Sequence, residues 1–253
     1  MPGPIQSIER AAAMLRLLAR GSGHHGLAEI AAALGLPKGT AHGILRTLQR
    51  VEFVEQDQNT GQYRLGAALL HLGTSYLDAN ELRSRSINWA DTLAARSGHE
   101  VRIGMHLDGA VLVVHHVFRP DDTMQTLGIG AMLPLHATAL GKVLLAYDAQ
   151  LFATIRRDEL TSLTRRTIVK PAALERVLTE VRGAGWASEA EEYMPGEASI
   201  AAPIRMPGGL VIGAIGISGS VDRIQAANRP KATLVDQVCH AAEAVSRALS
   251  AEN

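Results

Sequence analysis

The sequence has one cysteine, no long apolar run and no net charge, and each of the first two features excludes a class of protein. A single cysteine, Cys239, cannot form a disulfide within the chain or supply a thiolate metal cluster, so we interpret it as a small buried side chain. No stretch approaches the roughly 20 consecutive apolar residues of a membrane-spanning helix. The opening residues Met1 to Pro4 lack the pattern of a secretion signal, so we expect a cytoplasmic protein.

The charges are balanced, with 25 basic and 25 acidic residues among 253, so composition alone does not identify a protein that binds nucleic acid. Residues 1–76 carry seven lysines and arginines against five acidic residues, which is a weak asymmetry. The hydrophobic fraction of 47% is ample for packed cores in one large or two smaller domains. The assignment of function therefore depends on pattern.

The first fifty residues have the pattern of three short helices. Apolar residues recur at helical spacing after Ser7, the expected N-cap, and again over 27–34. The turn Gly35 to Pro37 follows, and a third helix is predicted from Pro37 to about Val51. Two helices joined by a short turn with glycine are typical of a helix-turn-helix. The expected inward stripe consists of Ile30, Leu34, Leu36, Ala41, Ile44, Leu45 and Leu48.

The third helix and the segment after it carry residues that suit DNA. Residues 53–56 and 62–65 flank a polar turn and predict a hairpin, which in this position is the wing of a winged helix-turn-helix. Arg46 is the first candidate for a base contact, because arginine can pair with guanine through two hydrogen bonds. The predicted DNA-binding residues are Lys38, Gly39, Thr40, His42, Gly43, Arg46, Thr47, Arg50 and Arg64. The alternative is a helical adaptor domain whose cationic face is only solvated.

The rest of the chain predicts an α+β domain with an antiparallel sheet. Apolar residues alternate with Arg102, Gly104 and His106, and Asp108-Gly109 predicts a hairpin turn. Further strands are expected over 110–118, 186–189, 200–206 and 210–218, and helices over 66–79, 82–96, 138–146, 171–182 and 230–249. We therefore predict a DNA-binding domain over 1–66, a linker helix over 67–80 and a larger domain over 81–253.

Several motifs, in this order, resemble the IclR family of bacterial transcriptional regulators over nearly the whole chain. They are IQSIERA at 5–11, GLPKGT at 35–40, LPLHATALGK at 133–142, GWASEAEE at 185–192, IAAPI at 200–204 and ISG at 217–219. The resemblance implies a winged-helix domain, a linker helix and a GAF-like effector-binding domain. It also implies operator DNA and a small-molecule effector as partners, homodimers or homotetramers, and transcriptional control by repression or activation. No enzymatic activity, cofactor or metal is expected.

The resemblance places the effector in a cleft of the GAF-like sheet. The residues that it implies are Ala139, Leu140, Gly141, Glu189, Ser199, Gly216 and Ser218. Thr138 is placed to cap a helix whose free N–H groups attract an anion, and Glu189 to accept hydrogen bonds from ligand hydroxyls. The alternatives are that Gly141 serves only packing, that Glu189 belongs to a solvated acidic run with Glu191 and Glu192, and that the serines satisfy backbone groups.

Two positions depart from the family pattern, with Ser199 where cysteine is common and Gly216 where serine is common. We expect a more polar and roomier pocket, which favours a hydroxylated ligand. Residues 76–121 are similar to those of actinobacterial glycerol-operon regulators. That similarity implies glycerol 3-phosphate as the effector, with its phosphate near the helix start and its hydroxyls near Glu189. An aromatic or organic acid is the alternative effector.

An enzyme with a GAF-like domain is the rival class. The segment 216–220 lacks the final glycine of a nucleophile elbow, and 128–130 lacks the third glycine of a dinucleotide fingerprint. His106, His115 and His116 lie on adjacent predicted strands, but no histidine pair has the spacing of a metal site. A sensor or scaffold that does not bind DNA is the third class. The combined pattern favours the regulator.

Overall fold

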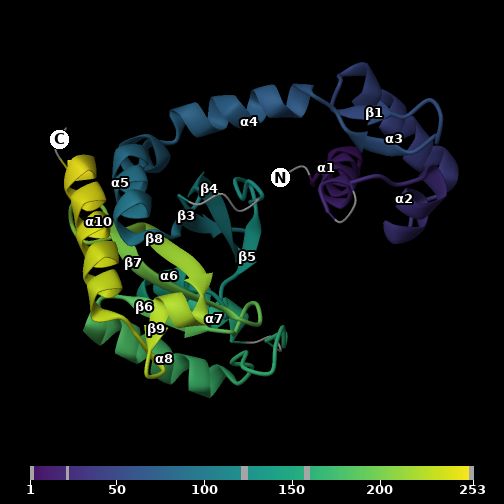
Figure 1. Cartoon of the computed structure of the whole chain (residues 1–253). Coiled ribbons are helices and arrows are strands. Elements are labelled where there is room, and N and C mark those ends of the chain that lie inside the picture. Colours follow the sequence, from purple (N-terminus) through teal and green to yellow (C-terminus); the bar gives the residue numbers. More distant parts are fainter. Residues whose placement is uncertain (1–2, 21–22, 121–124, 157–159, 251–253) are drawn as a thin grey trace. The chain divides into compact units, whose positions relative to one another are not determined.

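The computed structural model describes residues 3–20, 23–120, 125–156 and 160–250, which form two compact units, Met1–Ala79 and Asn80–Asn253 (Figure 1). The first unit contains α1 (Gln6–Leu18), α2 (Leu27–Ala33), α3 (Lys38–Arg50), β1 (Val54–Gln56), β2 (Tyr63–Leu65) and α4 (Ala68–Ala79). The three helices and the hairpin that the sequence predicts are therefore present, in the order of a winged helix-turn-helix.

Helices α1 to α3 and the hairpin share one apolar core. In the predicted stripe, Ile30, Ala41, Leu45 and Leu48 are buried, and Leu34, Leu36 and Ile44 are half-buried. Gly35 has a φ of +61° in the turn between α2 and α3, a conformation that favours glycine. The prediction that Ser7 caps α1 is wrong, because the helix begins at Gln6 and its N-cap is Ile5, with no side-chain hydrogen bond.

The wing is a two-stranded antiparallel hairpin in which Glu55 lies opposite Arg64. The Asp57 carboxylate closes its turn by accepting hydrogen bonds from the N–H groups of Asn59 at 2.8 Å and Thr60 at 2.9 Å. Gly61 completes the turn with a φ of +69°. The polar turn residues therefore fix the shape of the wing.

The second unit contains a six-stranded antiparallel sheet of order β5-β4-β3-β8-β7-β6. Its strands are β3 (Glu100–Leu107), β4 (Ala110–Val117), β5 (Met132–Pro134), β6 (Ala187–Ala190), β7 (Glu197–Arg205) and β8 (Val211–Ser220). A separate small hairpin pairs β9 (Gln225–Ala226) with β10 (Arg229–Pro230). The helices are α5 (Glu81–Ser97), α6 (Ala139–Tyr147), α7 (Ala149–Ile155), α8 (Pro171–Ala184), α9 (Val221–Ile224) and α10 (Ala232–Ser250). Among the described residues, no helix is both long and apolar enough to span a membrane.

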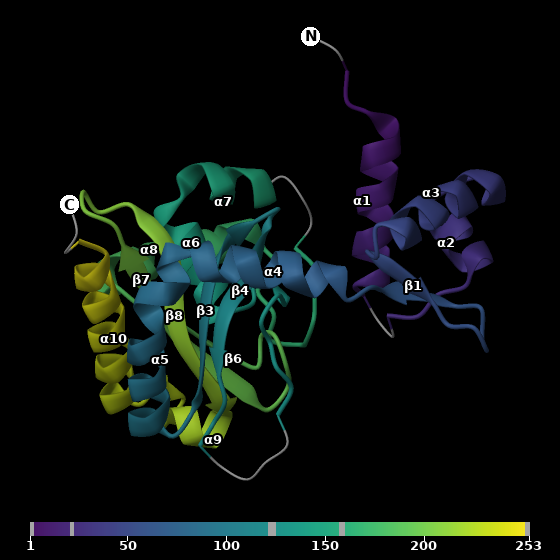
Figure 2. The ribbon, with the colours of Figure 1, turned by 90° about the horizontal axis from the view of Figure 1, so that it is seen from above.

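Helices cover both faces of this sheet (Figures 1 and 2). A Cβ on Gly104 of β3 would meet Leu140 of α6, whereas a Cβ on Gly213 of β8 would meet Leu82 of α5. Helix α10 packs beside α5 and against β7. Polar side chains on the face that α6 covers are therefore enclosed between a helix and the sheet, which creates the site described below.

Candidate DNA-binding helix and effector cavity

Eight of the nine predicted DNA-binding residues lie on α3, and Arg64 lies on β2. All are exposed except Thr40, which is half-buried. Because an α-helix has 3.6 residues per turn, Gly39, Gly43, Arg46 and Arg50 fall on the side opposite the buried residues of α3. This side combines two cations with two positions that carry no side chain, which suits a helix that enters a major groove.

Some of the predicted contacts are already engaged within the first unit. The Thr47 hydroxyl donates a hydrogen bond to the carbonyl of Gly43 at 3.0 Å. Arg64 Nη2 lies 2.9 Å from Glu55 Oε2, and this hydrogen bond holds the pKa of Glu55 below its ordinary value. Nη1 of Arg64 has no hydrogen-bond partner in the described part of the chain and can still donate to a phosphate, and exposed pairs like that of Arg64 with Glu55 contribute little to stability. Among the described residues, no acidic side chain forms an ion pair with Arg46 or Arg50.

The second unit contains a partly open cavity of about 30 Å³ between the sheet and the start of α6. Six of the seven predicted effector residues line it, namely Ala139, Leu140, Glu189, Ser199, Gly216 and Ser218. Gly141 does not line the cavity. A water molecule needs roughly 10–15 Å³, so the cavity is much smaller than a metabolite. Side chains around it must therefore move before an effector can bind.

Four polar side chains form a row across the sheet, and three of them, Ser218, Ser199 and Glu189, line the cavity. Strand register places Glu100 of β3 opposite Ser218 of β8, Ser218 opposite Ser199 of β7, and Ser199 opposite Glu189 of β6. The Ser218 hydroxyl donates to Glu100, and the Ser199 hydroxyl donates to Glu189 at 2.7 Å. Each serine therefore donates a hydrogen bond to the carboxylate at its own end of the row.

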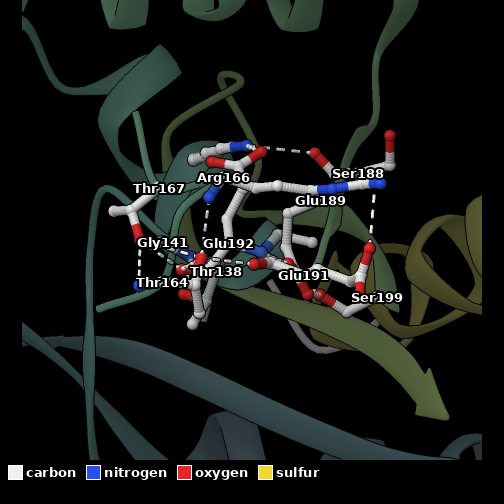
Figure 3. A network of polar contacts seen from close by, with 12 residues as sticks. Thr138, Gly141, Thr164, Arg166, Thr167, Ser188, Glu189, Glu191, Glu192 and Ser199 are labelled. Carbon is white, nitrogen blue, oxygen red and sulfur yellow. Dashed lines mark hydrogen bonds and ion pairs between the residues drawn. The ribbon is translucent and has the colours of Figure 1, made fainter. Parts of the chain in front are cut away.

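Glu189 is buried, and burial raises the pKa of its carboxyl. Oε1 accepts the hydrogen bond from Ser199, and Oε2 accepts one from the N–H of Glu192 at 3.0 Å (Figure 3). The alternative of a solvated acidic run is wrong for Glu189 and Glu192, which are 6% and 9% exposed. Glu191 is the partly exposed member and pairs with Arg166 at 3.1 Å. A buried carboxylate of this kind is suited to accept hydrogen bonds from ligand hydroxyls.

The start of α6 is a weaker binding site for an anion than the sequence suggests. Thr138 is the N-cap as predicted, and its Oγ1 accepts the N–H of Gly141 at 3.1 Å. The N–H of Ala139 donates to Ser199 Oγ at 3.4 Å, so this serine also satisfies a backbone group. Two N–H groups of the first turn thus already have acceptors.

Lys142, one turn into α6, is buried and pairs with Glu192. Its Nζ lies 2.5 Å from Glu192 Oε1 and 3.3 Å from the carbonyl of Ser188. The hydroxyl of Thr167 donates to the carbonyl of Glu192 at 2.7 Å. The pair therefore joins α6 to the segment that also holds Glu189.

Gly141 and Gly216 are in close contact with neighbouring backbone. A Cβ on Gly141 would lie 2.2 Å from the carbonyl oxygen of Leu135, which supports the packing interpretation of this glycine. A Cβ on Gly216 would lie 2.6 Å from the carbonyl oxygen of Ile200. The expectation of a roomier pocket at Gly216 is therefore wrong, because strand β7 occupies the space.

Replacing Gly141 by alanine is expected to lower the free energy of unfolding by about 1–3 kcal/mol, because the added methyl group meets backbone that cannot move aside. Gly183→Ala is the matched control, since Gly183 lies near the end of α8 and a Cβ there has no neighbour within 4 Å. That variant is expected to gain up to about 1 kcal/mol from helix propensity. Chemical denaturation measures the free energy of unfolding of both variants. Equal effects in the two variants would contradict the packing role of Gly141.

Several cavity residues were not predicted, and Arg102 is the most notable. Arg102, Tyr193 and Glu197 also line the cavity. Arg102 is one of the polar residues that alternate with apolar ones along β3, and this alternation does not indicate what covers the polar face. The missing signal was tertiary, because α6 covers that face. Burial, followed by the nearby charge of Glu100, raises the pKa of Glu197.

The three histidines considered as metal ligands do not form a cluster. His116 is buried and hydrogen-bonds Glu100 at 3.3 Å, whereas His106 is exposed and accepts the N–H of Gly109 at 3.2 Å. Within the described ranges, no group of three or more histidine, cysteine or acidic side chains is arranged to hold a metal ion.

Comparisons with known proteins match both units of the chain to one family. Residues 7–58 match the IclR helix-turn-helix domain, and residues 74–247 match the family model described as bacterial transcriptional regulator IclR C-terminal. The chain is 53% identical to the glycerol operon regulatory protein of Streptomyces coelicolor and 51% identical to that of Streptomyces griseus, each over 98% of this chain and 97% of the relative. It is 27% identical to the solved structure of an IclR transcriptional regulator from Alicyclobacillus acidocaldarius, with a TM-score of 0.85 over 98% of this chain and 100% of that one.

These relatives are named as regulators of transcription rather than as enzymes. The family models match both the unit that carries α3 and the unit that carries the cavity. The chain belongs to the IclR family of bacterial transcriptional regulators.

Proposed function

We propose that this IclR-type regulator binds a roughly palindromic operator as a homodimer or homotetramer, and that glycerol 3-phosphate modulates this binding. The observation that carries the effector assignment is the polar row from Glu100 to Glu189, of which Ser218, Ser199 and Glu189 line the cavity with hydroxyl and carboxylate groups. Two relatives with more than 50% identity over nearly their whole length are named glycerol operon regulatory proteins. A hydroxylated ligand suits this row better than an aromatic acid does.

In the proposed mechanism, α3 of each protomer enters a major groove, with Arg46 at a base edge and Arg50 at a phosphate. Effector binding favours one arrangement of the sensor domains, and the linker helix changes the spacing of the paired recognition helices. Coupling of this kind is reciprocal, so operator DNA must change effector affinity by the same factor. We propose residues 1–66 as the DNA-binding domain, 67–80 as the linker and 81–253 as the sensor. A protein with this role works in the cytoplasm, where bacterial DNA lies.

The test of this proposal combines the wild type with Glu189→Gln. Fluorescence anisotropy with an operator selected from random DNA by the protein itself measures operator affinity with and without glycerol 3-phosphate. The wild type is expected to change its operator affinity about 5- to 150-fold when the effector is added. Glu189→Gln should keep its operator affinity and lose most of that response, because the amide replaces one of the two acceptor oxygens by an NH2 donor and removes the charge.

Glu180→Gln, at an exposed position on α8, is the matched control and should respond as the wild type does. A full response in Glu189→Gln would remove Glu189 from the effector site. A wild type that responds to benzoate and not to glycerol 3-phosphate would establish the aromatic acid alternative. Operator binding that is insensitive to salt and to sequence would overturn the role of α3.

A further inference from the structure

Arg102 is the cation among the described residues that line the cavity, and its guanidinium is incompletely bonded. The side chain is 25% exposed, and Nη2 lies 2.9 Å from Glu100 Oε1. Nε is buried and has no hydrogen-bond partner. A partly buried guanidinium with an unused N–H group favours an acceptor that can bind two nitrogens at once.

Glu100 is the anion that Arg102 holds in this state, and it has two other donors. The Ser218 hydroxyl donates to it, and His116 Nε2 lies 3.3 Å from Glu100 Oε2. His116 Nδ1 accepts the N–H of Gly128 at 2.9 Å, so the proton of the neutral ring is on Nε2 and points to Glu100. Glu100 therefore stays hydrogen-bonded when Arg102 turns to another anion.

These donors also act on the ionisation of Glu100. Burial opposes the charged form, but the hydrogen bond from His116, the charge of Arg102 and the hydrogen bond from Ser218 together hold the pKa of Glu100 below its ordinary value. The carboxylate therefore remains an anion, and it competes with a ligand for Arg102.

The start of α6 is the other place where an anion was expected. As described above, Thr138 and Ser199 already accept two N–H groups of its first turn. Arg102 carries a full charge and an unused N–H group, whereas the helix start offers a partial charge. The arginine is therefore the stronger partner for a phosphate or carboxylate.

We propose that Arg102 binds the anionic group of the effector and that Glu100 occupies Arg102 until the effector replaces it. This inference rests on the proposed role of the cavity as the effector site. Arg102 lies on β3 and Glu189 on β6, three strand spacings away, or roughly 14 Å between backbones. The ligand class that spans from one to the other is a short chain with an anion at one end and hydroxyl groups at the other.

The experiment is isothermal titration calorimetry on the full-length protein with glycerol 3-phosphate, glycerol and benzoate as probes. Arg102→Gln is expected to weaken glycerol 3-phosphate binding about ten- to a hundredfold, because it removes charge-assisted hydrogen bonds to the phosphate. Binding of neutral glycerol should not change. Arg176→Gln, an exposed arginine on α8, is the control and should bind as the wild type does.

Glu100→Gln independently tests whether the effector replaces Glu100 on Arg102. It removes the charge that competes for Arg102 and keeps an amide that can hydrogen-bond Ser218 and His116. It is expected to bind glycerol 3-phosphate more tightly than the wild type does, and thermal unfolding checks that both variants fold. Arg102→Lys, which keeps the charge and loses the planar fork, should fall between the wild type and Arg102→Gln and gives a second reading if the glutamine variant is unfolded.

The outcomes separate this inference from the proposed function. Wild-type affinity for glycerol 3-phosphate in Arg102→Gln would overturn the role of Arg102 and leave the effector assignment standing. Loss of benzoate binding in Arg102→Gln, with a wild type that ignores glycerol 3-phosphate, would support Arg102 and overturn that effector. Unchanged or weaker binding by Glu100→Gln would overturn the exchange. A wild type that binds neither anion would overturn both effector assignments, while operator binding through α3 is measured separately.

Discussion

Arg46→Ala is expected to weaken operator binding about ten- to a hundredfold, because one arginine pairing with guanine contributes roughly 1–3 kcal/mol of discrimination. Arg46 lies on the face of α3 opposite its buried residues, between Gly43 and Arg50. Anisotropy titrations against the operator and against variants with single base changes measure the effect. The loss should be concentrated at one base pair, and effector binding should be unchanged.

Arg50→Ala is the informative comparison for Arg46→Ala. A phosphate contact is independent of sequence, so Arg50→Ala should weaken all DNA sites alike and reduce the salt dependence of binding by about one counterion. Arg46→Ala should instead relax the preference among operators. Unchanged operator affinity in Arg46→Ala would refute the base contact, and a uniform loss would reassign Arg46 to the phosphate backbone.

Lys142→Met is expected to lower the free energy of unfolding by about 3–5 kcal/mol, because it leaves the Glu192 carboxylate buried without its partner. Lys142 is 1% exposed, and burial already raises the pKa of Glu192 in spite of the lysine. One oxygen of Glu192, Oε2, has no hydrogen-bond partner in the wild type. Guanidinium unfolding followed by circular dichroism measures the loss.

The double variant Lys142→Met/Glu192→Leu distinguishes a stranded charge from a loss of packing. Replacing a buried ion pair by apolar residues is often neutral, so the double variant should recover most of the stability that the single variant loses. Lys170→Met, at an exposed lysine, is the control and should stay within about 0.5 kcal/mol of the wild type. A loss below about 1 kcal/mol in Lys142→Met would contradict the argument, as would a double variant no more stable than the single one.

Local signals predicted most of the fold. Pro37 marked the start of α3, and Asp108 and Gly109 have the positive φ values, 50° and 74°, of the hairpin turn that their types suggest. Thr138 is the N-cap of α6 because its hydroxyl accepts an N–H three residues later. Each of these features is decided by residues close together in the chain. Strand β5 and helix α7 were missed because short elements have too few residues to show a period.

The cavity depends on register, which is set between segments far apart in sequence. Glu100 and Ser218 are 118 positions apart and meet because β3 pairs with β8. Alternation along β3 correctly indicated that Arg102 and its neighbours share one face, and it carried no information on what covers that face. The family resemblance supplied most of the lining residues, and Arg102 was absent from it. The packing of α6 on the sheet is what turns a surface arginine into a pocket residue.

In the proposed function, the small volume of this cavity affects the time course of the response as well as its strength. A metabolite can enter only when the side chains that line the cavity move apart. The rate of metabolite binding must therefore level off as the metabolite concentration rises. Its measured affinity is also reduced by the fraction of time that the lining spends shut. A regulator built in this way averages over brief pulses of metabolite and reacts to a sustained supply.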